Sequence, residues 1–154
     1  MPRLEHWNVR TFDLDSTIAF YQDVVGLRSG PFSGDPRQGA WLYDDADIPV
    51  VHVIRLDRTR QDEEVAKIEA RLGELAGDID LDTSGSGMVD HVAFACEDFD
   101  AMLERVRMHG LLHKVANYPR LGVTQILIND PNGITLELNF RHKEGADAGP
   151  AGSA

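Results

Sequence analysis

The sequence contains a single cysteine and no long hydrophobic segment, and these two absences exclude several kinds of protein. Because Cys96 is the only cysteine among 154 residues, the chain cannot form an internal disulfide framework or a cysteine-ligated zinc site. No apolar run approaches the roughly 20 residues that a membrane-spanning helix needs. Residues 1–15 also lack the apolar core of a secretory signal. We therefore expect a cytoplasmic protein.

Positive charge is scarce as well. Lys and Arg number 15 against 26 Asp and Glu, which gives a formal net charge of −11. Nucleic acids and anionic membrane surfaces repel such a chain, so we expect neither as a partner. The length suits one globular domain over residues 1–142, and the small polar residues 143–154 predict a disordered tail.

Hydrophobic spacing predicts several strands and helices. Four apolar residues between positions 65 and 75 recur at intervals of 3, 4 and 3, which is typical of an amphipathic helix. Gly26 and Gly110 are expected helix ends. The expected strands include residues 4–9, 40–45, 48–56, 123–128 and 134–140, and the expected helices include 16–25 and 61–76.

Two segments of the chain are similar at a fixed offset of 85 residues. LEHWNV and VDHVAF place His6 and His91 at the same position of a strand, and His52 and Glu137 differ by the same offset. Within each half, the first of these residues precedes the last by 46 positions. A polar residue able to bind a metal therefore occupies the first and the last strand of each half.

The doubled pattern predicts an α+β fold of two tandem βαβββ modules. The first module covers residues 3–57 and the second residues 87–140, with an inserted helix and linker at 58–86. One such module cannot cover its own sheet, whereas two side by side can form a curved mixed sheet. We expect its concave face to be the metal and substrate pocket and to collect His6, His52, His91 and Glu137.

Other side chains are candidates for the same pocket. Alternation along a strand places Asn8 on the face of His6 and Asn139 on the face of Glu137. Three aromatic residues could either line the pocket or fill the core, namely Trp41, Tyr43 and Tyr118.

The motifs LEHWNVRTFDLDSTIAFYQDVVGL, GAWLYDDADIPVVHVI, VDHVAFACEDFDAM and INDPNGITLELNF stand in the order of a known superfamily. In this order and doubled spacing the chain resembles the vicinal oxygen chelate superfamily, which includes glyoxalase I, methylmalonyl-CoA epimerase, extradiol dioxygenases and bleomycin-binding proteins. The resemblance implies a small-molecule substrate and a homodimer. It also implies that His6, His91 and Glu137 are metal ligands, with His52 at the fourth position.

Imidazole and carboxylate groups suit a divalent Fe, Mn, Co, Ni or Zn ion. A lone histidine in an apolar strand is usually a packed core residue, but four such residues at repeat-equivalent positions favour a metal site. Glu137, between Leu136 and Leu138, would also need a partner if buried, and a metal ion is one.

Three functions remain open on the sequence. If His52 is a fourth ligand or the general base, the chain is a lyase or isomerase of the glyoxalase and epimerase kind. In that reaction the metal is a Lewis acid that stabilises an enediolate of a substrate with adjacent oxygens, and His52 and Glu137 are the catalytic candidates. If His52 stays off the metal, three positions are open for a catechol and dioxygen, as in an Fe(II) ring-cleaving dioxygenase. The third function is a non-catalytic protein that binds a drug or metabolite without metal.

Overall fold

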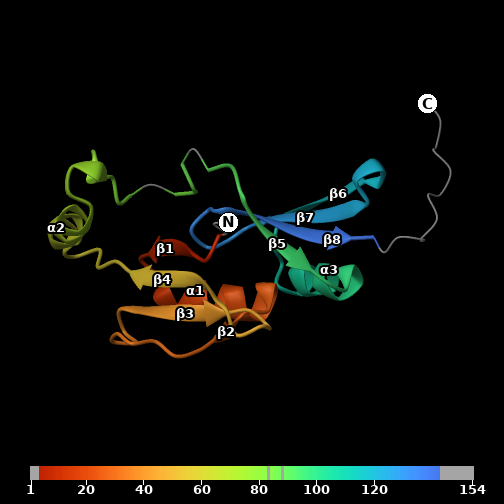
Figure 1. Ribbon diagram of the computed structural model, residues 1–154, viewed down its shortest axis with the longest axis horizontal. Helices are drawn as coiled ribbons and strands as arrows, with labels where there is room; N and C mark the ends of the chain where they lie inside the picture. Colours follow the sequence, from red (N-terminus) through yellow and green to blue (C-terminus); the bar gives the residue numbers. More distant parts are fainter. Residues whose placement is uncertain (1–3, 83, 88, 143–154) are drawn as a thin grey trace. The chain divides into compact units, whose positions relative to one another are not determined.

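The computed structural model describes residues 4–82, 84–87 and 89–142 (Figure 1). Contacts along the chain divide it into two compact units, residues 1–84 and residues 85–154. These units correspond to the two predicted modules, and the inserted helix belongs to the first. The predicted tail at 143–154 lies outside the described residues.

The first module contains one mixed sheet with strand order β1-β4-β3-β2. Strands β1 and β4 run parallel, whereas β3 is antiparallel to both β4 and β2. Its elements are β1 (Trp7–Thr11), α1 (Leu14–Phe20), the π-helical η1 (Tyr21–Val25), β2 (Arg28–Ser29), β3 (Gly39–Tyr43), β4 (Pro49–Arg55), α2 (Gln61–Leu72) and the 3₁₀ turn η2 (Gly73–Ala76).

The second module repeats this arrangement with strand order β5-β8-β7-β6. The pair β5 and β8 is parallel, and the other two pairs are antiparallel. Its elements are β5 (Val92–Cys96), α3 (Phe99–Met108), β6 (His113–Tyr118), the 3₁₀ turn η3 (Pro119–Leu121), β7 (Val123–Asn129) and β8 (Thr135–Arg141). The predicted α+β fold of two tandem βαβββ modules is confirmed, with one four-stranded sheet in each module.

Equivalent residues begin the first helix of each module. The Asp13 carboxylate accepts a hydrogen bond from the backbone N–H of Ser16 at 3.0 Å, and the Asp98 carboxylate accepts one from Ala101 at 3.1 Å. Such caps satisfy backbone donors that the first helical turn leaves free. Asp13 and Asp98 are separated by the same 85 residues as the histidines, so the repeat extends to helix initiation.

One face of each sheet forms the core. Apolar side chains alternate inward along the strands and pack under the helix of their own module, visible in Figure 1 as α1 behind β3 and β4. In the second module, Phe99 of α3 meets Phe140 of β8 edge to face, with ring centroids 5.3 Å apart. The buried apolar strand residues are Val9, Leu42, Val51 and Val53 in the first module, and Val123, Ile126, Ile128, Leu136, Leu138 and Phe140 in the second. Residues of the opposite alternation therefore share the other face.

The structure corrects several local expectations. His6 and His91 lie immediately before β1 and β5 rather than within them. The short strand β2 was not among the expected strands. The predicted helix over 61–76 changes to a 3₁₀ turn at Gly73, whose φ of +56° is left-handed, so Leu75 is 87% exposed.

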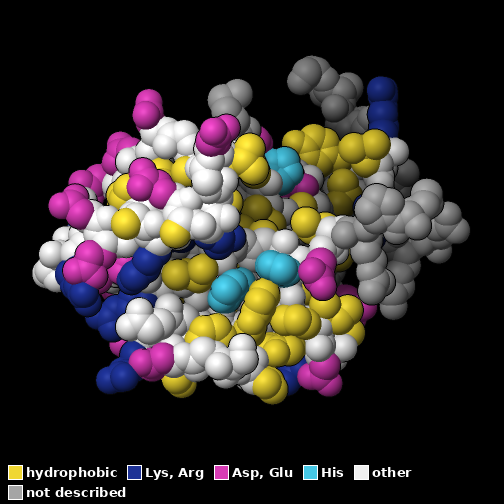
Figure 2. Space-filling view, turned by 60° about the vertical axis from the view of Figure 1, so that its left-hand side comes forward, with side chains coloured by type: hydrophobic (Ala, Val, Ile, Leu, Met, Phe, Trp, Pro, Cys, Tyr) yellow, Lys and Arg dark blue, Asp and Glu magenta, His cyan; other side chains and the backbone are white. Residues whose placement is uncertain are grey.

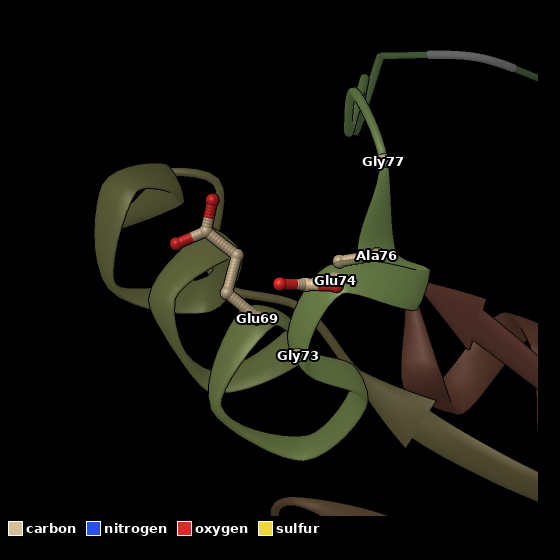
Figure 3. Close-up of a pocket in the computed structure, with 5 residues that line it drawn as sticks. All are labelled: Glu69, Gly73, Glu74, Ala76 and Gly77. Carbon is tan, nitrogen blue, oxygen red and sulfur yellow. The ribbon is translucent and has the colours of Figure 1, made fainter.

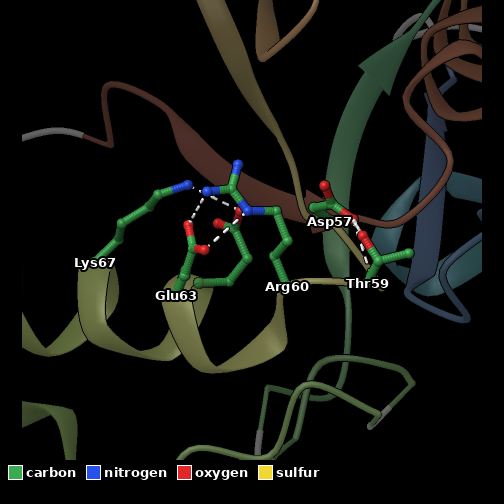
Figure 4. Close-up of polar contacts among 6 residues, drawn as sticks. Asp57, Thr59, Arg60, Glu63 and Lys67 are labelled. Carbon is green, nitrogen blue, oxygen red and sulfur yellow. Dashed lines mark hydrogen bonds and ion pairs between the residues drawn. The ribbon is translucent and has the colours of Figure 1, made fainter.

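The start of α2 is held by polar contacts between residues close in sequence (Figure 4). The Arg60 guanidinium pairs with the Glu63 carboxylate, and the Thr59 hydroxyl donates to Asp57 at 2.6 Å. Glu64 points inward and is buried, although a charge was not expected on that stripe. Its carboxylate accepts a hydrogen bond from Lys67 at 2.9 Å, which compensates for part of the desolvation.

Among the described residues, no helix combines the length and the apolar character needed to cross a membrane.

Removing a core side chain of the first module should destabilise that module. Leu42 is fully buried, so we expect Leu42→Ala to lower the free energy of unfolding by about 2–5 kcal/mol, through lost burial and the cavity left behind. Trp7 and Trp41 are the only tryptophans of the chain, and both belong to this module, so their fluorescence during urea unfolding reports it. The exposed Asn8→Ala variant is the control, with an expected change within about 0.5 kcal/mol. Equal effects of the two variants would contradict this assignment of the core face.

Candidate functional site

Four predicted site residues of the first module lie on or beside the open face of its sheet. His52 lies in β4, where Asn8 of β1 is its register partner on one side and Trp41 of β3 on the other. Paired residues of adjacent strands point to the same face, so these three side chains lie together. His6, just before β1, joins them through its contact with Trp41.

Trp41 holds both imidazole rings of this module. Its ring stacks on His52 with centroids 4.2 Å apart and an interplanar angle of 16°, and it meets His6 edge to face at 4.8 Å. Stacking covers one face of the His52 ring, whereas the ring nitrogens lie in its plane and stay available. Trp41 therefore orients His52 without consuming its lone pair.

The surroundings of His52 favour its neutral form. Burial lowers the pKa of His52, and the nearby charges of His6 and Arg71 lower it further. Arg71 belongs to α2, and it also lowers the pKa of Arg10, for which burial is the larger cause. Arg10 lies on the strand face of Asn8, so two guanidinium groups accompany His52. A neutral imidazole at neutral pH can bind a metal or accept a proton.

The open face of the second sheet places Glu137 within reach of His91. The distance from His91 Nε2 to Glu137 Oε2 is 3.5 Å, and the Glu137 side chain is only 16% exposed. Asn139, two residues along β8 on the same face, donates from Nδ2 to Glu137 Oε1 at 2.7 Å. The Oδ1 atom of Asn139 is buried and has no hydrogen-bond partner within the described ranges. A buried acceptor of this kind would suit a ligand that donates a hydrogen bond.

His91 is also contacted by Asp90. The Asp90 Oδ2 atom lies 2.8 Å from His91 Nδ1, and this hydrogen bond is the main cause that raises the pKa of His91, with a smaller contribution from the charge of Glu137. The first module has a weaker counterpart, since Glu5 Oε2 lies 3.4 Å from His6 Nδ1. In both modules, therefore, an acidic residue precedes the histidine and faces its Nδ1 atom.

Two predicted pocket residues have other surroundings. The Tyr43 hydroxyl donates to the backbone carbonyl of Pro31 at 2.8 Å, and its ring lies against Gly30. Tyr43 thus anchors the segment after β2. Tyr118 ends β6, two strands from β8 and opposite Val123, so the sheet does not bring it beside Glu137.

The side chains present fit a divalent metal ion as two pairs of donors. Within either module, the described residues form no group of three His, Cys, Asp or Glu side chains that could hold a metal. Two ligands about 2.0–2.2 Å from one ion lie about 3.0–3.5 Å apart, which matches the separation of the His91 and Glu137 donor atoms. Figure 2 shows histidine side chains at the molecular surface, where an ion can reach them.

Sequence reasoning missed Glu5, Asp90, Arg10 and Arg71. The first two could have been found, because they occupy the same offset of 85 as the histidines that follow them. Arg71 could not, because no pattern in the inserted helix indicates that it approaches His52. Cys96 is not part of either donor pair, and burial raises the pKa of its thiol to about 11, which keeps it protonated.

A separate surface hollow lies beside the end of α2 (Figure 3). It has a volume of about 500 Å³ and shares no lining residue with the predicted site. Its lining consists of Glu69, Gly73, Glu74, Ala76 and Gly77.

The pKa of His52 should lie below the ordinary histidine pKa of 6.5, and the pKa of His91 should lie above it. In metal-free protein, NMR resonances should give a midpoint below 6.5 for His52 and above 6.5 for His91. Arg71→Gln should raise the His52 midpoint, because a charge that opposes protonation is removed. Lys67→Gln, on the same helix, is the matched control and should leave it nearly unchanged. The reverse order of the two midpoints would contradict these environments.

Comparison with protein-family models identifies one family. A family model described as Glyoxalase/Bleomycin resistance protein/Dioxygenase superfamily matches residues 3–138. No curated protein matches the sequence.

Solved structures share the fold at low sequence identity. A glyoxylase/bleomycin resistance protein/dioxygenase domain from Frankia sp. EAN1pec is 15% identical, with a TM-score of 0.63, and covers 92% of this chain and 99% of its own. A glyoxalase/bleomycin resistance protein/dioxygenase from Nocardioides is 22% identical, with a TM-score of 0.56 and coverage of 99% and 91%. A lactoylglutathione lyase from Agrobacterium tumefaciens is 20% identical, with a TM-score of 0.57 and coverage of 90% and 92%. With the match over residues 3–138 and two modules of the same topology, the chain belongs to the glyoxalase/bleomycin resistance protein/dioxygenase superfamily.

Proposed function

We propose that this protein is a metal-dependent lyase or isomerase of the glyoxalase and epimerase kind, acting on a small substrate with adjacent oxygens. The observation that carries the proposal is the pairing of donors at equivalent positions. His6 and His52 share the open side of one module, and His91 and Glu137 face each other at 3.5 Å in the other. Family membership supports the proposal, because the superfamily is named for glyoxalases and dioxygenases.

In this proposal, His6, His91 and Glu137 hold a divalent Fe, Mn, Co, Ni or Zn ion, and His52 is a fourth ligand or the general base. When bound, the ion supplies Lewis-acid stabilisation of the negative charge that develops on two adjacent substrate oxygens. As the general base, His52 would move the proton, since its lowered pKa leaves the ring nitrogen free to accept one at neutral pH. Arg10 and Arg71 add positive charge beside His52, which favours an anionic reacting group.

Asn139 has a separate role. Its Nδ2 atom donates to Glu137 Oε1, which fixes the carboxylate orientation. Its Oδ1 atom, without a partner among the described residues, can accept a hydrogen bond from a substrate hydroxyl. A homodimer in the cytoplasm, expected from the resemblance and the composition, remains a prediction that sedimentation and cell fractionation can test.

Metal content is the first test of this proposal. Protein purified without chelator or nickel should contain about one divalent ion per chain, and His6→Ala or Glu137→Ala should reduce metal affinity by about a hundredfold or more. Elemental analysis and competition with a chromophoric chelator measure both. His109→Ala is the control, since His109 lies at the end of α3, in neither donor pair, and should retain the metal. Metal-free wild-type protein with ligand affinity unaffected by His6→Ala would instead identify a non-catalytic binding protein.

The reaction class is tested by hydrogen exchange. Metal-loaded protein in D₂O should exchange the carbon-bound hydrogen beside the carbonyl of 2-hydroxyketones or thiol adducts of 2-oxoaldehydes, followed by NMR. His52→Ala should lower that exchange rate by about 10²–10⁴-fold, because it removes the proton acceptor.

The rival reaction is catechol cleavage, which the histidine at position 52 favours through the resemblance to extradiol dioxygenases. Protein loaded with Fe(II) without air and given catechols should consume no oxygen. Oxygen uptake with iron, and none with cobalt, nickel or zinc, would replace our proposal with the dioxygenase.

A further inference from the structure

We propose that Asp90 and Glu5 are positioning residues, each holding the Nδ1 atom of the next histidine so that Nε2 is the nitrogen offered to the metal. This inference rests on the proposed metal site and deepens it. The contacts are a 2.8 Å hydrogen bond between Asp90 Oδ2 and His91 Nδ1, and a 3.4 Å approach of Glu5 Oε2 to His6 Nδ1. Both carboxylates face the same ring atom, one in each of the two modules.

The chemistry of imidazole gives these contacts a consequence. A neutral ring carries one N–H, and a carboxylate at Nδ1 favours the form in which Nδ1 holds the hydrogen and Nε2 carries the free lone pair. In the second module, Nε2 is the His91 atom that lies 3.5 Å from Glu137 Oε2. The hydrogen bond on one side of the ring therefore directs the metal-binding nitrogen toward the second ligand on the other side.

A purely structural role explains these contacts poorly. The Asp90 and Glu5 side chains are 94% and 80% exposed, and exposed ion pairs contribute little to folding stability. The acidic residue nevertheless precedes the histidine in both modules, at the offset of 85 that relates the histidines themselves. The positions of Glu5 and Asp90 have in common that a histidine follows each of them. We therefore assign to both carboxylates the function of orienting that histidine ring.

The first readout needs no metal. Long-range ¹H–¹⁵N NMR on metal-free protein, at a pH where the imidazoles are neutral, reports which ring nitrogen of His91 carries the hydrogen. The wild type should show it on Nδ1, and Asp90→Ala should shift the population toward Nε2. Comparison with His91→Gln assigns the resonance.

The second readout is Zn²⁺ affinity, measured by competition with a chromophoric chelator. Asp90→Ala should weaken binding by about 10–100-fold, and Asp90→Asn should lose less, because its amide oxygen can still accept the Nδ1 hydrogen. Glu5→Ala should have a smaller effect than Asp90→Ala, in keeping with its longer contact. Glu97→Ala is the matched control, since it removes an equal exposed charge from the same module without a contact to His91 and should change affinity less than twofold.

The outcomes separate the two proposals. Wild-type protein that binds no Zn²⁺ overturns the proposed function and this inference with it. Wild-type protein that binds Zn²⁺, with Asp90→Ala matching Glu97→Ala in affinity or leaving the His91 tautomer unchanged, overturns the positioning role alone.

Discussion

The alternation of side chains along the strands is the constraint on which the rest of this structure depends. In each module, the helix covers one face of the sheet and leaves the other face open. Residues Leu136 and Leu138 must then point into the core, and Glu137 between them must point away. The same logic places His52 outward between Val51 and Val53. A shift of one residue in either strand would bury the ionisable group and expose two aliphatic ones, so the register that forms the core also selects the candidate ligands.

The open faces differ in how they hold their ionisable groups. In the first module an aromatic ring orients the histidines, since Trp41 stacks on His52 and meets His6 edge to face. In the second, hydrogen bonds do so, from Asp90 to His91 and from Asn139 to Glu137. A duplicated architecture has thus acquired two different means of fixing a donor pair. Burial, together with the charges of His6 and Arg71, lowers the pKa of His52, whereas the hydrogen bond from Asp90 is the main cause that raises the pKa of His91.

Local and periodic features of the sequence were enough to predict most of the fold. The two modules and their order were predicted from three features: glycines that end helices, apolar alternation and the offset of 85 residues. The same features predicted that His52 and Glu137 lie in strands. Strand β2 was missed because two residues, Arg28 and Ser29, carry no periodicity. Tyr43 was ambiguous for a different reason: its hydroxyl is satisfied by the Pro31 carbonyl, a contact that depends on the path of an irregular segment. The approach of Arg71 to His52 depends on how α2 packs, which hydrophobic spacing alone does not specify.

The last strand of each module carries histidine in one case and glutamate in the other, at equivalent positions. In the proposed centre, three neutral imidazoles and one carboxylate would leave a divalent ion with a net charge of about +1. A second glutamate at position 52 would bring the centre to neutrality. In that proposed centre, the identity of this single residue would set the net charge around the ion, within a chain whose total charge is −11. Anionic oxygens would be drawn to a locally cationic centre on an otherwise acidic protein, and position 52 can change that preference without altering the module that holds Glu137.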